Sequence, residues 1–297
     1  GGQPERAAHY GPFPAGFVQV PHCLEYRKQW DVADYGRRAA DAIEEVILRE
    51  GPETVGGLVL EPITAGGGVI VPPEGYWPRV QEICEKYDIL LHIDEVVCGM
   101  GRTGEWFGYQ NFGVKPDIVT MAKGLASGYA AISCTVTTER VFDMFKDDAS
   151  DPLGYFRDIS TFGGCTAGPA AALENMAILE EENLLANTKE RGAQLMARLE
   201  ALKAKYPIVG DVRGMGLFQG VELVADRETR EPLDEKIVAK VVAAVGARGV
   251  MIGMTNRSLP GLNNTLCLSP GLIVTAAEID TIAEAIDGAL EEISATL

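Results

Sequence analysis

Positive charge and histidine are both scarce in this sequence. Its 297 residues include 26 Lys and Arg against 43 Asp and Glu, a formal net charge of −17, and only 3 histidines. A chain of this charge repels phosphate backbones and anionic membrane surfaces unless a local basic patch reverses the balance. No such patch occurs, so we expect no nucleic-acid partner. The few histidines also give little material for a Ser-His-Asp hydrolase or a catalytic metal site, and we expect no metal.

Long apolar runs and paired cysteines are missing as well. No run of about 18 apolar residues occurs, so no membrane span is expected. The six cysteines never form a C-x-x-C pair, and several lie in apolar, strand-like runs, which is typical of reduced thiols in a cytoplasmic protein. The first residues have neither the basic region nor the apolar core of a secretory signal. We therefore expect a soluble, cytoplasmic protein.

Nucleotide-binding motifs are incomplete. Residues 99–104 match G-x-G-x-x-G after a predicted strand, but the aromatic, Gly and Pro residues that follow leave no room for the helix of a dinucleotide-binding fold. The apolar strand that ends at Asp94 and Glu95 is also typical of Mg²⁺ binding in P-loop NTPases. No G-x-x-x-x-G-K-[ST] loop accompanies it. We therefore predict neither type of nucleotide site.

What the sequence does contain is an alternation of helix and strand patterns. The predicted helices are 35–50, 75–87, 169–181 and 184–206, and the predicted strands are 55–60, 89–93, 117–120 and 130–136. A smaller alternation follows, and a capping box at Thr275 and Glu278 opens the last helix. Arg213 is interpreted as part of a structural turn. The pattern predicts an α/β fold with two domains, 1–182 and 183–297.

Four polar residues stand out because of their positions relative to the predicted strands. Glu61, Asp94 and Lys123 each follow a strand, and Thr161 lies in a later turn next to glycines. Open α/β sheets bind ligands at the carboxyl ends of their strands. An amine and a carboxylate at neighbouring strand ends suit an aldehyde cofactor with a basic ring nitrogen, as in pyridoxal phosphate enzymes. The alternatives are a lysine in solvent at the rim, a helix-capping aspartate and a turn threonine.

Five blocks of the sequence together resemble the signature of class III aminotransferases. In order, they are Glu61-Pro62, Asp94-Glu95-Val96, 99–104, 120–124 and 160–164. The resemblance runs from about Tyr10 to the C-terminus. It implies fold type I of the pyridoxal phosphate enzymes, with a mostly parallel sheet flanked by helices in the large domain and a smaller C-terminal α/β domain. It also implies that the N-terminal part of the family, with its phosphate-binding loop, is absent from this chain.

The resemblance assigns a role to each cofactor-binding candidate. Lys123 would form a Schiff base with pyridoxal 5'-phosphate and shuttle protons during catalysis. Asp94 would pair with the ring nitrogen, and Val96 would pack against the ring, although a plain core valine has the same sequence pattern. Thr161 would bind the cofactor phosphate of the other subunit. The implied assembly is therefore a homodimer with shared active sites, and pairing of dimers into a tetramer is left open.

The substrate candidates depart from the amino-acid-specific members of the family. There, the residue at Glu61 pairs with an arginine that binds the substrate carboxylate, but Cys267 stands at the matching position here. Arg257 resembles instead the mobile arginine of ω-amino acid:pyruvate members, although it could also be a solvated loop residue. Residues 161–166 and 255–269 are most similar to members that transfer an amino group from taurine to pyruvate. The alternatives are β-alanine, hypotaurine or a diamine as the amino donor, or a non-catalytic homologue of the family.

Overall fold

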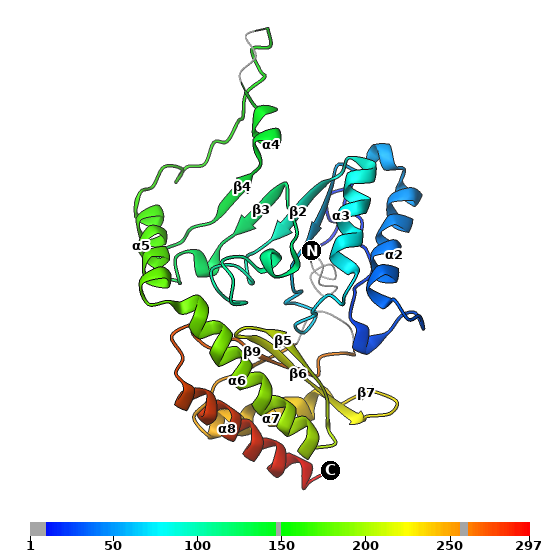
Figure 1. The fold of residues 1–297 in the computed structure, drawn as a ribbon, viewed down its shortest axis with the longest axis vertical. Coiled ribbons are helices and arrows are strands. Elements are labelled where there is room, and N and C mark those ends of the chain that lie inside the picture. Colours follow the sequence, from blue (N-terminus) through cyan, green and yellow to red (C-terminus); the bar gives the residue numbers. More distant parts are fainter. Residues whose placement is uncertain (1–9, 147–149, 256–260) are drawn as a thin grey trace.

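Two β-sheets, one in each half of the chain, organise the molecule (Figure 1). The computed structural model describes residues 10–146, 150–255 and 261–297. The first sheet has the order β1 (Gly57–Leu60), β2 (Leu90–Asp94), β3 (Ile118–Met121), β4 (Cys134–Thr137). Strands β1 to β3 are parallel, and β4 joins them antiparallel. The parallel strands therefore end at one edge of the sheet.

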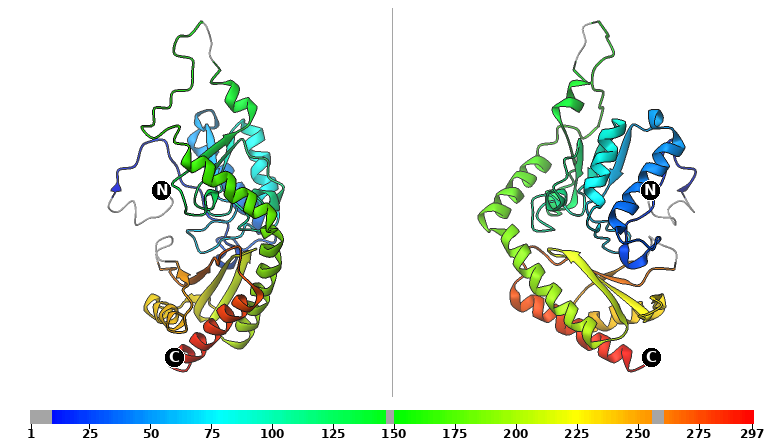
Figure 2. Two further views of the ribbon diagram at one scale, coloured as in Figure 1. Left: turned by 90° about the vertical axis from the view of Figure 1, so that its left-hand side faces the viewer. Right: turned by 45° about the vertical axis from the view of Figure 1, so that its right-hand side comes forward.

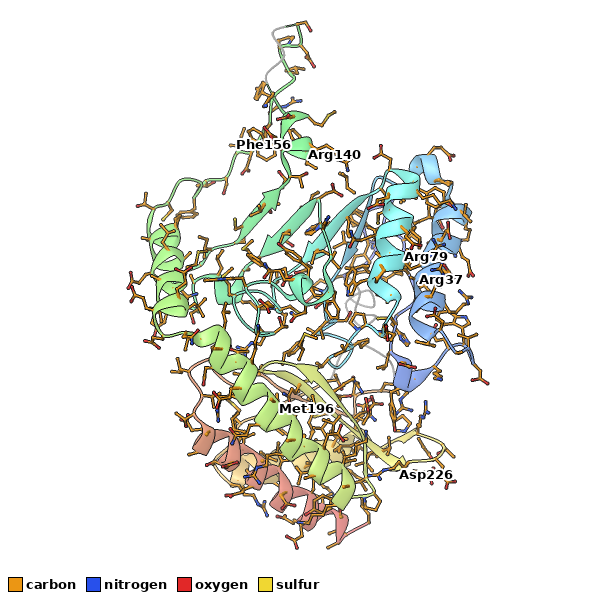
Figure 3. All side chains as sticks on the ribbon, in the orientation of Figure 1. Arg37, Arg79, Arg140, Phe156, Met196 and Asp226 are labelled. Atoms are coloured by element: carbon orange, nitrogen blue, oxygen red, sulfur yellow. The ribbon has the colours of Figure 1, made fainter. Side chains whose placement is uncertain are left out.

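Helices α2 (Tyr35–Glu50) and α3 (Tyr76–Tyr87) pack together on one face of this sheet. Asp34 caps α2 by accepting a hydrogen bond from the backbone N–H of Arg37, and Gly51 ends the helix with a φ of +90°. Arg79 of α3, labelled in Figure 3, binds the carboxylates of Asp41 and Glu44 on α2. Apolar side chains of both helices and of the strands form the core beneath them. Short 3-10 turns η1 (Glu25–Arg27) and η2 (Pro52–Thr54) flank α2.

The second sheet is antiparallel and lies against three helices. Its strand order is β5 (Val209–Met215), β6 (Phe218–Asp226), β9 (Thr265–Leu268), β8 (Gly253–Met254), with β7 (Glu231–Pro232) paired to β6. The helices are α6 (Leu184–Lys205), α7 (Glu235–Ala247) and α8 (Ala276–Ser294). Fully buried side chains such as Leu199 and Ile286 join them in one hydrophobic core. The predicted capping box of α8 is confirmed, because Thr275 and Glu278 each accept the other's backbone N–H.

A long segment extends away from both sheets, and we call it the arm, residues 138–146 and 150–166. It contains the short helix α4 (Glu139–Asp143) and returns to the body at α5 (Ala167–Glu181). Figures 1 and 2 show that the arm projects beyond the sheets, and Arg140 near its base binds Asp88 and Asp117 of the body. Several of its large apolar side chains are exposed, among them Phe142, Phe156, Ile159 and Phe162.

The structure confirms the α/β alternation and corrects two local predictions. Arg213 lies within β5 and not in a turn, because Val209 and Val212 face the core and β5 pairs with β6 along its length. The predicted strand 130–136 is shorter and begins at Cys134. After residues 99–104 the next regular element is the 3-10 helix η3 (Gly108–Phe112) and not an α-helix, as the aromatic, Gly and Pro residues of this stretch predicted.

Two expectations drawn from composition can also be compared with the described residues. All six cysteines are free thiols; Cys165 is exposed, whereas the others are buried or half-buried. None of the helices in the described part of the chain has the length and apolar character that a membrane crossing needs.

Candidate active site

Three predicted side chains come together at the carboxyl edge of the parallel strands. Glu61 directly follows β1, Asp94 is the last residue of β2, and Lys123 lies two residues beyond β3. Their charges are close enough to act on each other. Burial raises the pKa of Glu61, the backbone N–H of Ala65 counteracts this, Asp94 raises the pKa further and Lys123 lowers it. The sheet thus gathers one amine and two carboxylates in one region.

Lys123 has an unusual backbone and an available amine. Its φ is +43°, in the left-handed region that a lysine rarely adopts, at the start of the 3-10 turn η4 (Lys123–Leu125). Gly124 follows because a Cβ there would lie 3.1 Å from Cβ of Met100. The Lys123 side chain is exposed, and within residues 10–146, 150–255 and 261–297 it makes no hydrogen bond or ion pair. Strained backbone beside an unpaired amine is typical of a functional position.

Asp94 is oriented by the backbone that follows it. Its Oδ1 accepts a 2.9 Å hydrogen bond from the N–H of Val96, and both residues are half-buried. Thr120 of β3 lies directly opposite Asp94, and its Oγ1 is 3.0 Å from Nε2 of His92. Burial lowers the pKa of His92, and Asp94 opposes that effect. The amine of Lys123 could form a covalent bond with an aldehyde. The carboxylate of Asp94 could hold a proton on a basic ring.

Glu61 opens a loop that ends in a strained turn. Its Oε2 accepts the N–H of Ala65 at 3.0 Å, and the loop then reaches Val69, a buried β-branched residue with a φ of +57°. Arg213 of β5 binds this turn by donating from Nη2 to the carbonyl of Gly68 at 2.7 Å and from Nε to that of Val69 at 3.1 Å. The second sheet therefore supports the loop that carries Glu61.

Arg213 itself is held by two carboxylates, of which Glu222 is buried and Asp211 is half-buried. Its Nη1 donates to Glu222 at 2.6 Å and to Asp211 at 2.9 Å, and Nε of Arg27 donates to the other oxygen of Glu222 at 2.7 Å. The interpretation of Arg213 as a turn residue missed this role. Asp211 and Arg213 interrupt the short apolar run, so no clear sequence signal indicated that Arg213 belonged to a strand.

Cys267 makes no hydrogen bond to Glu61 in the described part of the chain. It lies in β9 and packs against an apolar cluster that contains Ile63, Val69, Cys98 and Phe218. Burial raises its pKa to about 11, and Arg213 counteracts that rise. Glu61 makes no ion pair with any arginine that the structure describes.

The remaining candidates are not brought to this edge. Thr161 lies in the arm, in the turn 161–164, and is exposed, with no recorded contact to Glu61, Asp94 or Lys123. Arg257 lies outside the described residues.

Sequence reasoning gave no role to Glu95, which the structure places among the most buried polar residues. The residue is 1% exposed, and its carboxylate accepts the backbone N–H of Gly108 at 2.9 Å and of Tyr109 at 2.8 Å. Burial raises the pKa of Glu95 to about 7; the N–H groups of Tyr109 and Gly108 counteract the rise, and Asp94 adds to it. The adjacency of two acidic residues at a strand end was the available signal.

Comparison with known proteins identifies related sequences over nearly the whole chain. The family model described as aminotransferase class-III matches residues 2–290. A hypotaurine/taurine–pyruvate aminotransferase from Paracoccus denitrificans is 71% identical over 294 residues, which cover 99% of this chain and 64% of that protein. A taurine–pyruvate aminotransferase from Rhodobacter capsulatus is 69% identical with the same coverage. The chain therefore spans 64% of the length of these curated relatives.

Solved structures give the same result for the fold. The crystal structure of a Bacillus anthracis aminotransferase superposes with a TM-score of 0.92 at 38% sequence identity, covering 98% of this chain and 64% of that one. Together with the two sheets and their helices, this confirms the predicted α/β fold of the type I pyridoxal phosphate transferases.

Proposed function

Because the chain belongs to the class III aminotransferases, we propose that the protein transfers an amino group from a terminal amine, such as taurine, to pyruvate. The observation that carries the proposal is the grouping of Lys123, Asp94 and Glu61 at one sheet edge. Identities of 71% and 69% to relatives named for taurine and pyruvate support this choice of substrates.

Pyridoxal 5'-phosphate is the cofactor of class III aminotransferases, and the side chains at this edge fit it. The aldehyde needs a primary amine, which Lys123 offers without a competing ion pair in the described residues. The ring nitrogen needs a carboxylate, which Asp94 offers. When bound, the cofactor supplies an electron sink for the substrate carbon. We assign covalent attachment to Lys123, the ring nitrogen to Asp94, a ring contact to Val96 and the phosphate to Thr161 of a second copy.

The side chains of this chain would then handle the protons of the reaction. Nζ of Lys123 accepts the proton that leaves the substrate carbon and donates it again in the following step, as a general base and then a general acid. The carboxylate of Asp94 holds the proton on the ring nitrogen, because an adjacent negative charge stabilises the protonated ring. Lys123 follows β3, and Asp94 ends β2, the strand paired with β3, so the two residues lie at neighbouring strand ends.

Arg257 and Glu61 are the proposed substrate-binding residues. A guanidinium binds a carboxylate or a sulfonate through paired N–H donors, which suits both pyruvate and taurine. Glu61 has a raised pKa and no arginine partner in the residues that the structure describes, so it is available to contact the substrate. Cys267 occupies an apolar cluster and offers no positive charge to an α-carboxylate.

We also propose that the protein is cytoplasmic and that it forms a homodimer with shared active sites. The exposed aromatic and aliphatic side chains of the arm would be covered by a second copy, and the exposed hydroxyl of Thr161 lies in the same segment. Pairing of such dimers would give a tetramer. Free cysteine thiols support the cytoplasmic location.

The division into domains 1–182 and 183–297 is likewise a proposal. Separate hydrophobic cores support it: one lies under α2 and α3, and the other joins α6, α7 and α8.

The proposed reaction is tested with the full-length protein, pyridoxal phosphate and pyruvate. Taurine, hypotaurine, β-alanine and a diamine are compared as donors at equal concentration, and alanine formation is measured. We expect taurine to give the highest kcat/KM. A higher value for hypotaurine, β-alanine or the diamine would refute the taurine assignment and keep the aminotransferase, whereas cofactor uptake without alanine from any donor would identify a non-catalytic homologue.

A further inference from the structure

The loop that follows Asp94 is fastened by a single buried carboxylate. Oε2 of Glu95 accepts the N–H of Gly108 at 2.9 Å, and Oε1 accepts the N–H of Tyr109 at 2.8 Å. Glu95 stands 13 and 14 residues before its two partners, so these bonds close the loop 95–109 at its base. With 1% of its surface exposed, Glu95 has no contact with bulk water that could replace either partner.

Gly108 and Gly99 lie close to Glu95, at positions where a Cβ atom would come too near to neighbouring atoms. A Cβ at Gly108 would lie 2.7 Å from Cβ of Cys98 and 3.0 Å from Cβ of Pro62, so the backbone of Gly108 is pressed against the end of the sheet. A Cβ at Gly99 would lie 2.8 Å from the carbonyl oxygen of Glu95, which itself accepts the N–H of Gly99 at 3.0 Å. Both glycines bring backbone N–H groups close to Glu95.

The backbone of Glu95 is also connected to the groups that orient Asp94. The N–H of Glu95 donates to the carbonyl of Thr120 on β3 at 2.8 Å, and the next N–H, that of Val96, donates to Oδ1 of Asp94. A movement of the Glu95 backbone therefore moves the donor that fixes the Asp94 carboxylate. The side chain of Glu95 restrains this backbone through the loop that it closes.

We propose that Glu95 is a positioning residue for Asp94: by binding the N–H groups of Gly108 and Tyr109, its carboxylate holds the 95–109 loop and so fixes the direction of the Asp94 carboxylate toward the cofactor ring nitrogen. This inference rests on the proposed function, which supplies the cofactor. The buried carboxylate of Glu95 binds backbone N–H groups of the loop, so its proposed effect on the cofactor passes through Asp94.

Replacing Glu95 by glutamine separates this role from simple packing. Both partners of Glu95 are donors, and a glutamine side chain has one acceptor oxygen and one NH₂ group. In either orientation of the amide, one backbone N–H faces another donor and loses its partner. A side chain that only filled space would tolerate the isosteric Glu95→Gln change. Glu105→Gln is the matched control, because Glu105 is exposed in the same loop and its carboxylate binds only the exposed Lys189 among the described residues.

The first measurement is hydrogen exchange in the full-length protein without cofactor. The amides of Gly108 and Tyr109 should exchange about tenfold faster or more in Glu95→Gln than in the wild type, because one buried N–H loses its acceptor. Glu105→Gln should exchange as the wild type does. Equal exchange in wild type and Glu95→Gln would overturn the proposed loop contact.

The second measurement is the release rate of bound pyridoxal phosphate. Glu95→Gln should release it about tenfold faster or more than wild type and Glu105→Gln, since the backbone that orients Asp94 is held less firmly. An analogue in which carbon replaces the ring nitrogen gives the decisive comparison, because it offers Asp94 no ring nitrogen to pair with. The variant and the wild type should release this analogue at similar rates. Equally accelerated release of both compounds would show a general structural effect and overturn the positioning role.

Two further results would concern the proposed function and the folding of the Glu95→Gln variant. If the wild type never takes up pyridoxal phosphate, the proposed function fails, and this inference fails with it for that separate reason. If Glu95→Gln does not fold, exchange in the wild type decides: protection of both amides far above that of a free peptide supports the loop contact, and exchange at the free-peptide rate refutes it.

Discussion

Replacing Arg213 by methionine should destabilise the protein strongly, because this one guanidinium serves several buried acceptors. It donates to Glu222 and Asp211 and to the carbonyl groups of Gly68 and Val69. The side chain of Arg213 is 9% exposed, and that of Glu222 is 2% exposed. Water therefore cannot replace the lost donors at most of these positions.

The magnitude follows from which partners remain. Removing one member of a buried ion pair costs ~3–5 kcal/mol when the other charge is left uncompensated. Here Arg27 still binds Glu222, which reduces that part of the cost, but the two carbonyl groups of the strained turn lose their donor. Unsatisfied buried groups cost ~1–3 kcal/mol each. We therefore expect Arg213→Met to lower the free energy of unfolding by about 3 kcal/mol.

The assay is urea unfolding of the full-length protein, followed by circular dichroism. Arg198→Met is the matched control: Arg198 pairs with Asp280 on the surface, with side-chain exposures of 55% and 36%. Such a pair contributes about 0–1 kcal/mol, so the control should stay close to the wild type. If both variants lose the same small amount, less than about 1 kcal/mol, the buried network does not support the fold as described.

Three further predictions concern pH, the last helix and the arm. Burial raises the pKa of folded Glu95 to about 7 from an ordinary 4.5, so ionisation of Glu95 opposes folding. The free energy of unfolding of the wild type should therefore fall relative to that of Glu95→Gln as the pH rises from 4.5 to 7. A constant difference between the two proteins would contradict this prediction. Thr275→Ala should cost about 1 kcal/mol in urea unfolding by removing the cap of α8, and no loss would show that the capping box is unimportant. Phe156→Asp should halve the mass seen by analytical ultracentrifugation, because Phe156 would lie in the dimer interface, and an unchanged mass would exclude that place for it.

Hydrophobic periodicity was enough to predict most of the fold. The helix 35–50 and the strands around 58 and 91 follow directly from apolar spacing, because these residues form the core under α2 and α3. The strand β5 was missed because its charged residues, Asp211 and Arg213, interrupt the apolar run, and only the pairing with β6 and the buried partner Glu222 make them compatible with a strand.

The site could be predicted in part for a similar reason. Strand ends placed Glu61, Asp94 and Lys123 at one edge, since parallel neighbours in register end together. Glu95 could not be assigned in this way, because its partners are backbone N–H groups 13 and 14 residues away that carry no sequence signal. The position of Thr161 on an exposed arm follows from no local pattern either.

The most direct test of the central claim replaces Lys123 by alanine in the full-length protein, with Lys115→Ala, an exposed lysine before β3, as the control. Alanine formation from taurine and pyruvate is measured with saturating pyridoxal phosphate. If Lys123 attaches the cofactor and moves the proton, its loss should lower kcat by about a thousandfold or more, while the control keeps wild-type turnover. Turnover by Lys123→Ala at the wild-type rate would contradict the assignment of this site.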